Sequence, residues 1–158
     1  MIRIITVGKI KESYFRDAVA EYEKRLRPYV KLQIIEVQDE PCPQGISDAE
    51  ALQIKEKEGR RILEKTDDKD YVITLEIKGK KMSSEVFACM MQDLAVSSHP
   101  DIAFVIGGSL GLSDEVMKRS DRGVSFSDMT FPHQLMRVIL LEQIYRSYKI
   151  NRNEPYHK

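Results

Sequence analysis

Three glycines stand where an apolar run of the sequence gives way to acidic residues. The stretch FVIGGSLGLSDEV, residues 104–116, places Gly107, Gly108 and Gly111 between that run and Ser113, which two acids follow. A strand that runs through glycines into the start of a helix is where α/β proteins commonly hold a ligand. The spacing fits neither the G-x-G-x-x-G fingerprint nor the P-loop, which argues against an ordinary dinucleotide or phosphate site. A tight turn with no ligand is the alternative.

Two further segments are expected at the same place as these glycines. Thr74-Leu75-Glu76 closes an apolar run at 71–77, and SDMTFP, residues 127–132, follows a short run at 123–126. If these runs are parallel strands, their carboxyl ends meet at the sheet edge where open α/β sheets bind ligands. The segments are apolar, with many backbone donors and few charges. Such a pocket suits an adenine ring better than a phosphate group.

The composition is ordinary for a soluble globular protein. The chain has 158 residues, of which 42% are hydrophobic and 32% charged. No apolar run approaches the ~20 residues of a membrane span, and the N-terminus lacks the apolar centre of a signal peptide. We therefore expect a cytoplasmic protein with no membrane partner. Cys42 and Cys89 show no CxxC spacing and His99, His133 and His157 are scattered, so neither a disulfide nor a metal site is expected.

The charges are unevenly distributed although the net charge is zero. Residues 1–37 carry eight basic against five acidic side chains, residues 38–131 carry twelve against eighteen, and residues 132–158 carry five against two. Local scatter would account for this pattern. The basic C-terminal stretch, however, also contains the rings of His133, Tyr145, Tyr148, Tyr156 and His157. Cations interleaved with rings suit a polyanion with exposed bases, such as RNA.

Hydrophobic periodicity predicts alternating strands and helices in one domain, residues 1–158. The expected strands are 2–7, 32–37, 71–77, 102–106 and 123–126, and the expected helices are 14–26, 47–65, 84–96, 113–119 and 133–148. Ser47 and Glu50 predict a capping box. Alternating elements indicate an α/β fold with a mostly parallel sheet flanked by helices. The pattern suggests a Rossmann-like or flavodoxin-like open sheet, and nothing in the periodicity distinguishes these from a rarer threading of the chain. The last helix is apolar nearly all round, which indicates core or a subunit interface.

Four blocks of the sequence resemble one known bacterial family. They are TLEIKGK (74–80), FVIGGSLGLS (104–113), SFSDMTFPHQLMRVILLEQIYRSYKI (125–150) and NEPYHK (153–158). Their order and spacing resemble the ribosomal large-subunit pseudouridine N3-methyltransferases (RlmH) of the SPOUT superfamily, over essentially the whole chain. The resemblance implies an α/β knot with a C-terminal trefoil knot, which elementary folding rules alone would not suggest. It also implies a homodimer packed through the last helix, where Leu141 and Ile144 are the interface positions we expect.

The resemblance further implies a pocket for S-adenosylmethionine. Leu75, Met129 and Phe131 are expected to flank the adenine, and Gly108 is expected to let the cofactor approach the main chain. Asp128 belongs to the pocket loop without a side-chain role. The full set implied for the cofactor is Leu75, Gly107, Gly108, Ser127, Asp128, Met129, Thr130, Phe131 and Pro132. No metal is implied.

The implied reaction is methylation of N3 of the pseudouridine at position 1915 of 23S rRNA, within the assembled ribosome. Because the N3–H is weakly acidic, a general base or a cation that stabilises the anion is expected. The catalytic candidates are His133, Tyr156 and His157; the candidates for binding substrate are Arg137, Glu142, Arg146 and Arg152. Which residue takes the proton stays open. The tail is expected to complete the site across the dimer interface. Another methyltransferase of the superfamily, or a non-catalytic ribosome-associated assembly factor with this fold, is the alternative.

Overall fold

The computed structural model describes residues 1–97 and 101–158, so that His99 lies outside the described residues. Strands and helices alternate along most of the chain. In order, they are β1 (Ile2–Val7), α1 (Ser13–Leu26), β2 (Leu32–Val37), α2 (Asp48–Leu63), β3 (Tyr71–Lys81), α3 (Ser84–Val96), β4 (Ile102–Ile106), α4 (Asp114–Arg119), β5 (Arg122–Ser125) and α5 (His133–Asn151). No helix in these ranges is long and apolar enough to cross a membrane.

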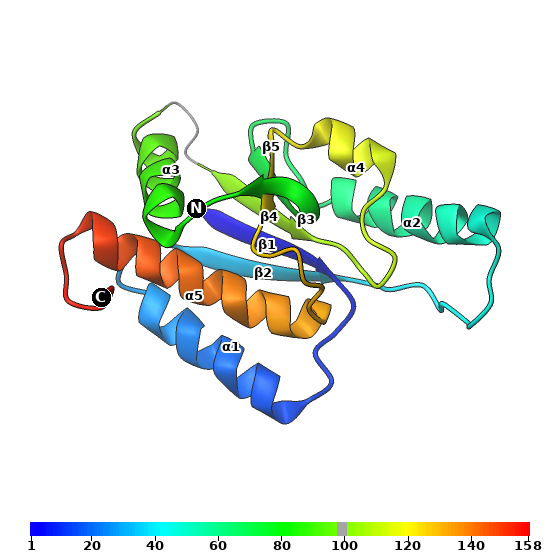
Figure 1. The fold of residues 1–158 in the computed structure, drawn as a ribbon, viewed down its shortest axis with the longest axis horizontal. Helices are drawn as coiled ribbons and strands as arrows, with labels where there is room; N and C mark the ends of the chain where they lie inside the picture. Colours follow the sequence, from blue (N-terminus) through cyan, green and yellow to red (C-terminus); the bar gives the residue numbers. More distant parts are fainter. Residues whose placement is uncertain (98–100) are drawn as a thin grey trace.

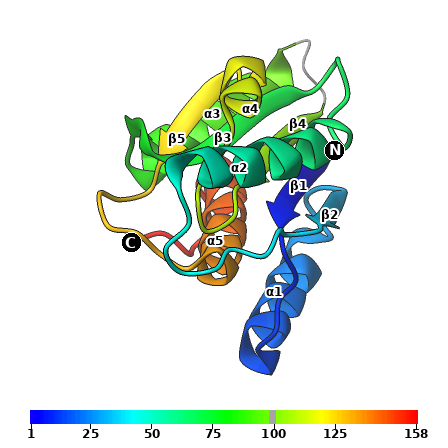
Figure 2. The same cartoon turned by 90° about the vertical axis from the view of Figure 1, so that its right-hand side faces the viewer.

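The strands form one parallel sheet in the order β2-β1-β4-β3-β5. Helices α1, α3 and α5 cover one face, and α2 and α4 cover the other (Figures 1 and 2). A flavodoxin-like sheet has the order 2-1-3-4-5 and a Rossmann sheet 3-2-1-4-5-6. The present sheet has neither order, because β4 lies between β1 and β3. The expected α/β class is therefore confirmed, and both of the specific sheets left open by the sequence are wrong.

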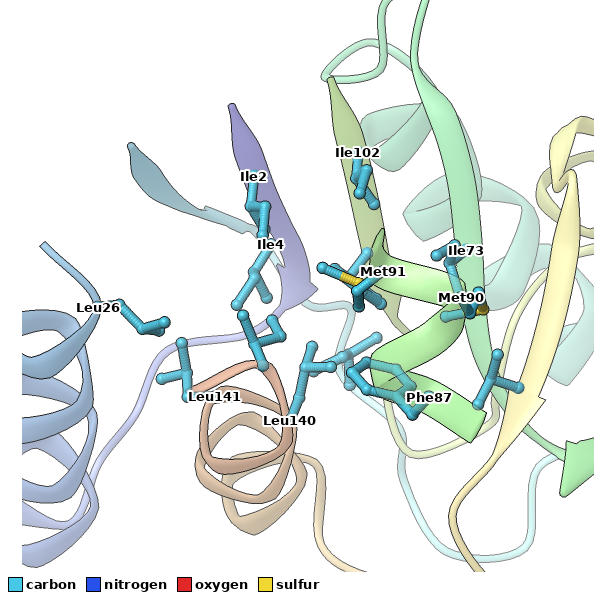
Figure 3. Close-up of a cluster of buried hydrophobic side chains, with 14 of the residues drawn as sticks. Ile2, Ile4, Leu26, Ile73, Phe87, Met90, Met91, Ile102, Leu140 and Leu141 are labelled. Atoms are coloured by element: carbon cyan, nitrogen blue, oxygen red, sulfur yellow. The ribbon is translucent and has the colours of Figure 1, made fainter. Parts of the chain in front are cut away.

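Alternation along the strands divides the core between the two faces. Ile2 and Ile4 of β1 pack toward α1, α3 and α5 (Figure 3), whereas Ile5 and Val7 pack toward α2 and α4. All six residues of β1 are buried because the strand lies between β2 and β4 with helices on both faces. Burying each large apolar side chain of this kind contributes about 1.5–3 kcal/mol.

Serine side chains fix the start of three helices. Ser47 accepts a hydrogen bond from the Glu50 amide at 3.3 Å while Glu50 Oε2 accepts one from the Ser47 amide at 2.8 Å, so the predicted capping box is present. Ser83 caps α3, and Ser113 caps α4. The sequence predicted that α4 begins at Ser113, whereas the helix begins one residue later, at Asp114. Each such cap stabilises its helix by about 1 kcal/mol.

The last helix extends past its expected end, and two of its residues lie elsewhere than predicted. It continues to Asn151, whose side-chain amide donates to the Ala88 carbonyl of α3 at 2.9 Å. Leu141 and Ile144, expected at a subunit interface, are 0% exposed within the single chain (Figure 3 labels Leu141). They therefore belong to the core of one subunit and do not report on an interface.

Strand β3 also runs past its expected end at Ile77, and this extension meets β5 a second time. Val124 of β5 pairs first with Leu75 and again with Lys80, and the register breaks between those two partners. Residues 76–79 therefore form an irregular bulge of β3 beside Val124; we call residues 76–81 the wrapping segment. At its closest point a Cβ added to Gly79 would lie 2.7 Å from the backbone nitrogen of Val124. Two chain segments meet here with no room for a side chain.

This contact predicts that Gly79→Ala destabilises the protein. The added methyl group meets backbone atoms of β5, which cannot rotate away, and overpacking of this kind costs about 1–3 kcal/mol. That cost outweighs the ~0.4–1 kcal/mol gained by making the unfolded chain stiffer. Urea unfolding measures the difference, with Lys80→Ala at the exposed neighbouring position as the control. Equal stability of the two variants would show that the contact between residue 79 and the backbone of Val124 tolerates a methyl group.

Candidate functional site

The carboxyl end of β4 lies between two points where the chain changes faces. After β4 the chain enters α4 on one face, whereas after the neighbouring strands β1 and β3 it enters α1 and α3 on the other. Such switch points leave crevices at the strand ends, where open α/β sheets bind ligands. Gly107 and Gly108 directly follow β4 and so lie between the two switch points.

The structure brings the residues predicted for the cofactor to this edge. Leu75 pairs with Ile106, which puts it beside Gly107, and Val124 pairs with Leu75, so the segment after β5 begins at the same edge. Within that segment Ser127 and Phe131 are half-buried, Met129 is 74% exposed, and Asp128, Thr130 and Pro132 are exposed. An ion pair from Lys81 to Asp128 joins the wrapping segment to the segment after β5.

Backbone donors of the segment after β5 fit the polar edge of an adenine ring. Ser127 is fixed by two bonds, since its Oγ accepts from the Met129 amide at 3.0 Å and its carbonyl accepts from Ser125 Oγ at 3.0 Å. Within the described ranges, the amides of Asp128, Thr130 and Phe131 donate to no protein acceptor. Leu75 and Phe131 are half-buried apolar residues of the same edge. The residues therefore fit a flat ring with a hydrogen-bonding rim.

Gly108 is required by the protein's own packing. A Cβ at this position would lie 2.8 Å from Glu58 Oε2 and 3.1 Å from Val7 Cγ1. The glycine that was predicted to admit a cofactor thus also admits the carboxyl group of helix α2. A bulky substitution at Gly108 would disturb this packing before it met any ligand, so it is a poor test of ligand binding.

Glu58 is a residue of this edge that the sequence reasoning missed. It is 5% exposed, and its Oε1 accepts a hydrogen bond from the Glu40 amide at 2.9 Å. Burial raises the pKa of the Glu58 carboxyl, and the neighbouring acids Asp39 and Glu40 raise it further. A signal was available, because Glu58 stands four residues from both Ile54 and Ile62, on the apolar stripe of its helix.

His133 stands at the other side of the glycines, beside the end of β1. A Cβ built on Gly8 would lie 3.6 Å from both His133 Nε2 and the Asp39 carboxyl carbon, so all three groups lie close together. Burial, and next the charge of Arg137, lower the pKa of His133. The imidazole is therefore neutral around pH 7 and able to accept a proton.

Arg137, one turn along α5, is buried rather than directed into solvent. It is 1% exposed; its Nη2 donates to the carbonyls of Val7 at 3.1 Å and Gly8 at 2.6 Å, and its Nη1 pairs with Glu36 at 2.7 Å. These contacts fix α5 to the ends of β1 and β2. The substrate contact predicted for Arg137 stays a prediction.

The tail packs against its own chain. The Tyr156 hydroxyl donates to Glu142 Oε1 at 3.1 Å, and the Arg146 guanidinium lies over the Tyr156 ring at 4.7 Å while also pairing with Glu142. Burial, followed by the charge of Glu142, raises the pKa of Tyr156 to about 12. Glu154 accepts from Tyr29 at 2.8 Å and pairs with Lys149. Three of the predicted substrate and catalytic residues are thus brought together.

The neighbours of His157 fix its tautomer. Arg146 Nη1 lies 3.1 Å from His157 Nδ1, and Glu85 Oε1 lies 2.8 Å from His157 Nε2. A guanidinium only donates, so Nδ1 must accept and the proton must sit on Nε2, where it is donated to Glu85. In this arrangement the imidazole has no free lone pair.

The tail and the pocket lie apart within one chain. The pocket segments adjoin the start of α5, whereas Tyr156 packs against Glu142, nine residues further along the helix, or about 13 Å at 1.5 Å per residue. Figure 1 shows the C-terminus at the far end of α5 from the segment that precedes it. Arg152 is exposed and lies over the Tyr29 ring at 4.6 Å, away from both. The described residues contain no group of three or more His, Cys, Asp or Glu that could hold a metal ion.

Comparison with known proteins matches this chain over almost its whole length. The family model described as "Predicted SPOUT methyltransferase" matches residues 1–157. A curated relative from Exiguobacterium sp., named "Ribosomal RNA large subunit methyltransferase H", is 60% identical over 157 residues, covering 99% of each chain.

Two solved structures share the fold at low sequence identity. A probable methylase family protein from Haemophilus influenzae has a TM-score of 0.57 and 12% identity, covering 99% of this chain and 70% of its own. A putative methyltransferase from Legionella pneumophila, solved with bound SAM, has a TM-score of 0.51 and 16% identity, covering 93% of this chain and 66% of its own.

The environment of Glu58 predicts how stability depends on pH. Its raised pKa means that the folded chain holds the proton more tightly than the unfolded chain does. Stability therefore falls as pH rises from the ordinary glutamate range through the raised value. Glu58→Gln cannot ionise, so its free energy of unfolding should exceed that of the wild type increasingly as pH rises.

Urea unfolding from about pH 4 to about pH 8, which spans the range above the ordinary glutamate pKa, measures this difference. Glu56→Gln, an exposed position on the same helix, is the matched control and should leave the pH profile unchanged. Parallel profiles for the wild type and Glu58→Gln would contradict the assignment.

Proposed function

The chain belongs to the SPOUT methyltransferase family, and we propose that it methylates N3 of the pseudouridine at position 1915 of 23S rRNA, using S-adenosylmethionine, in the cytoplasm. The observation that carries this proposal is the 60% identity over 99% of both chains to a relative named as a ribosomal RNA large subunit methyltransferase. The segments at the carboxyl ends of β3, β4 and β5 support the proposal, because their backbone donors and apolar residues suit the adenine of this cofactor.

Support for the cofactor comes from the pocket and from a structural neighbour. The Legionella neighbour contains bound SAM. In this chain, Leu75 and Phe131 would pack against the adenine while the free amides of Asp128, Thr130 and Phe131 bind its edge. When bound, S-adenosylmethionine supplies an electrophilic methyl group on a sulfonium. No metal is required for that transfer.

The protein's own task is to position the base and remove its N3 proton. Correct positioning alone lowers such a barrier by about 7–11 kcal/mol. His133 is neutral and lies at the pocket edge, so it is the group best prepared to accept a proton. His157 offers a lone pair only after Arg146 leaves Nδ1. A phosphate or the base anion, bound by Arg146, would withdraw it and so couple substrate binding to the release of His157.

A homodimer resolves the separation of the tail from the pocket. Tyr156 and His157 are held at the middle of α5, too far from the pocket of their own chain to reach a base bound there. Ile139 of α5 is half-buried and belongs to neither core cluster, so it offers apolar surface to a second copy. In such a dimer the tail of each subunit would complete the pocket of its partner, where Tyr156 would orient the base and Arg152 would bind the RNA backbone.

Mapping of rRNA modifications tests the function directly. Mass spectrometry of 23S rRNA from cells with and without this protein should show one methyl group lost from the pseudouridine at position 1915. Purified protein with S-adenosylmethionine should restore that methyl group on ribosomes from the deficient cells. A methyl group at another nucleotide would assign a different substrate. Binding of ribosomes without S-adenosylmethionine binding or methylation would identify an assembly factor.

Mixed dimers test whether the tail acts in the partner's site. Phe131→Asp should impair the pocket, and His157→Ala should impair the tail, each reducing methyl transfer at least a hundredfold, the scale of a lost acid–base group. Mixing the two inactive proteins should restore about a quarter of wild-type activity, because half of the dimers are mixed and each has one intact site. Calorimetry with S-adenosylmethionine is the control, since only Phe131→Asp should lose binding. No recovery after verified subunit exchange would place the tail in its own subunit's site.

A further inference from the structure

The wrapping segment presents two lysines whose charge is not neutralised. Lys78 and Lys80 are exposed and, within the residues that the structure describes, make no ion pair or hydrogen bond through their side chains. The third lysine of the segment, Lys81, pairs with Asp128. The acidic residue of the segment, Glu76, accepts from Thr74 Oγ1 at 3.0 Å and packs beside Gly123, so it is directed away from them.

The backbone holds these two lysines in place. Gly79, which stands between them, packs against the backbone of Val124. Lys78 and Lys80 are exposed, so their side chains reach solvent. Because β3 pairs with β5 on both sides of the register break, little ordering of the backbone is needed on binding.

Lys78 and Lys80 lie in a segment that is joined to the residues predicted to bind the cofactor. The Lys81–Asp128 pair joins the wrapping segment to the pocket segment, whose next residue, Met129, is 74% exposed. Residues 38–131 carry twelve basic against eighteen acidic side chains, so the pair is a local basic site within an acidic region. Two positive charges at the edge of an otherwise acidic region suit an anionic group of the substrate.

We propose that Lys78 and Lys80 form a phosphate-binding rim that holds the sugar–phosphate backbone of the rRNA next to the target base. The proposal rests on the proposed function, because it names a contact of that substrate. Ammonium groups bind phosphates as point charges and fix the register of a nucleic acid without reading its sequence. The rim would thus position the stem-loop over the pocket, while the groups in the pocket select the base.

The test compares the double variant Lys78→Ala/Lys80→Ala with Lys65→Ala/Lys69→Ala. Lys65 and Lys69 are exposed lysines just before the amino end of β3, at the opposite edge of the sheet. The rim variant should weaken binding to undermethylated ribosomes about tenfold and lower the slope of log affinity against log salt by roughly 0.7–0.9 for each lysine. In methyl-transfer assays KM should rise with kcat nearly unchanged. S-adenosylmethionine affinity should not change, and the control variant should behave as the wild type.

The other outcomes separate a failure of this proposal from a failure of the proposed function. Unaltered ribosome affinity and salt dependence would show that the lysines contact no phosphate. Weakened S-adenosylmethionine binding would assign them to the carboxylate of the cofactor. Ribosome binding by sedimentation needs no catalysis, so it separates this inference from the proposed function. A wild type that binds ribosomes through these lysines but methylates no rRNA would refute only the function, and a wild type that binds no ribosome would refute the rim.

Discussion

The buried guanidinium of Arg137 is the contact on which the geometry of the strand ends depends. A charge that is 1% exposed is costly to desolvate, and it is tolerated because the carbonyls of Val7 and Gly8 and the carboxylate of Glu36 surround it. Those three partners come from the ends of β1 and β2. The guanidinium therefore fixes where α5 begins relative to the sheet, and with it His133, which lies one turn earlier beside Gly8. Removing it would leave the carbonyls of Val7 and Gly8 without this donor and free the start of the helix.

The second constraint is backbone contact without side chains. Gly79 lies against Val124, and a Cβ at Gly123 would overlap Glu76 Oε1 at 1.9 Å, so each segment has a glycine where the other passes. This close approach holds Leu75, the wrapping segment and the start of the segment after β5 in one place. Local rigidity of this kind keeps the backbone amides at this edge in defined positions, because these are set by the chain path rather than by flexible side chains.

Local features of the sequence predicted the elements well, and features that depend on distant partners were not predictable. Alternating apolar residues located all five strands, and Ser47 with Glu50 located a helix start, since both signals are read within a few residues. The order β1-β4-β3 and the second pairing of β3 depend on contacts across the chain, as does the continuation of α5 to Asn151. Burial was also misjudged for single residues: Glu58 was overlooked, Leu141 and Ile144 were assigned to an interface, and the burial of Arg137 was not predicted. A helical stripe shows which residues share a face but not what covers that face.

The two sides of the turn at Gly107 and Gly108 differ in charge. On the β1 side lie the carboxyl groups of Glu58 and Asp39, whereas on the β3 side stand the ammonium groups of Lys78 and Lys80. The glycine turn after β4 therefore separates acidic groups from basic ones. Fields of opposite sign on its two sides act on an approaching ion before contact, so a cation and a polyanion meet different forces at this edge of the sheet.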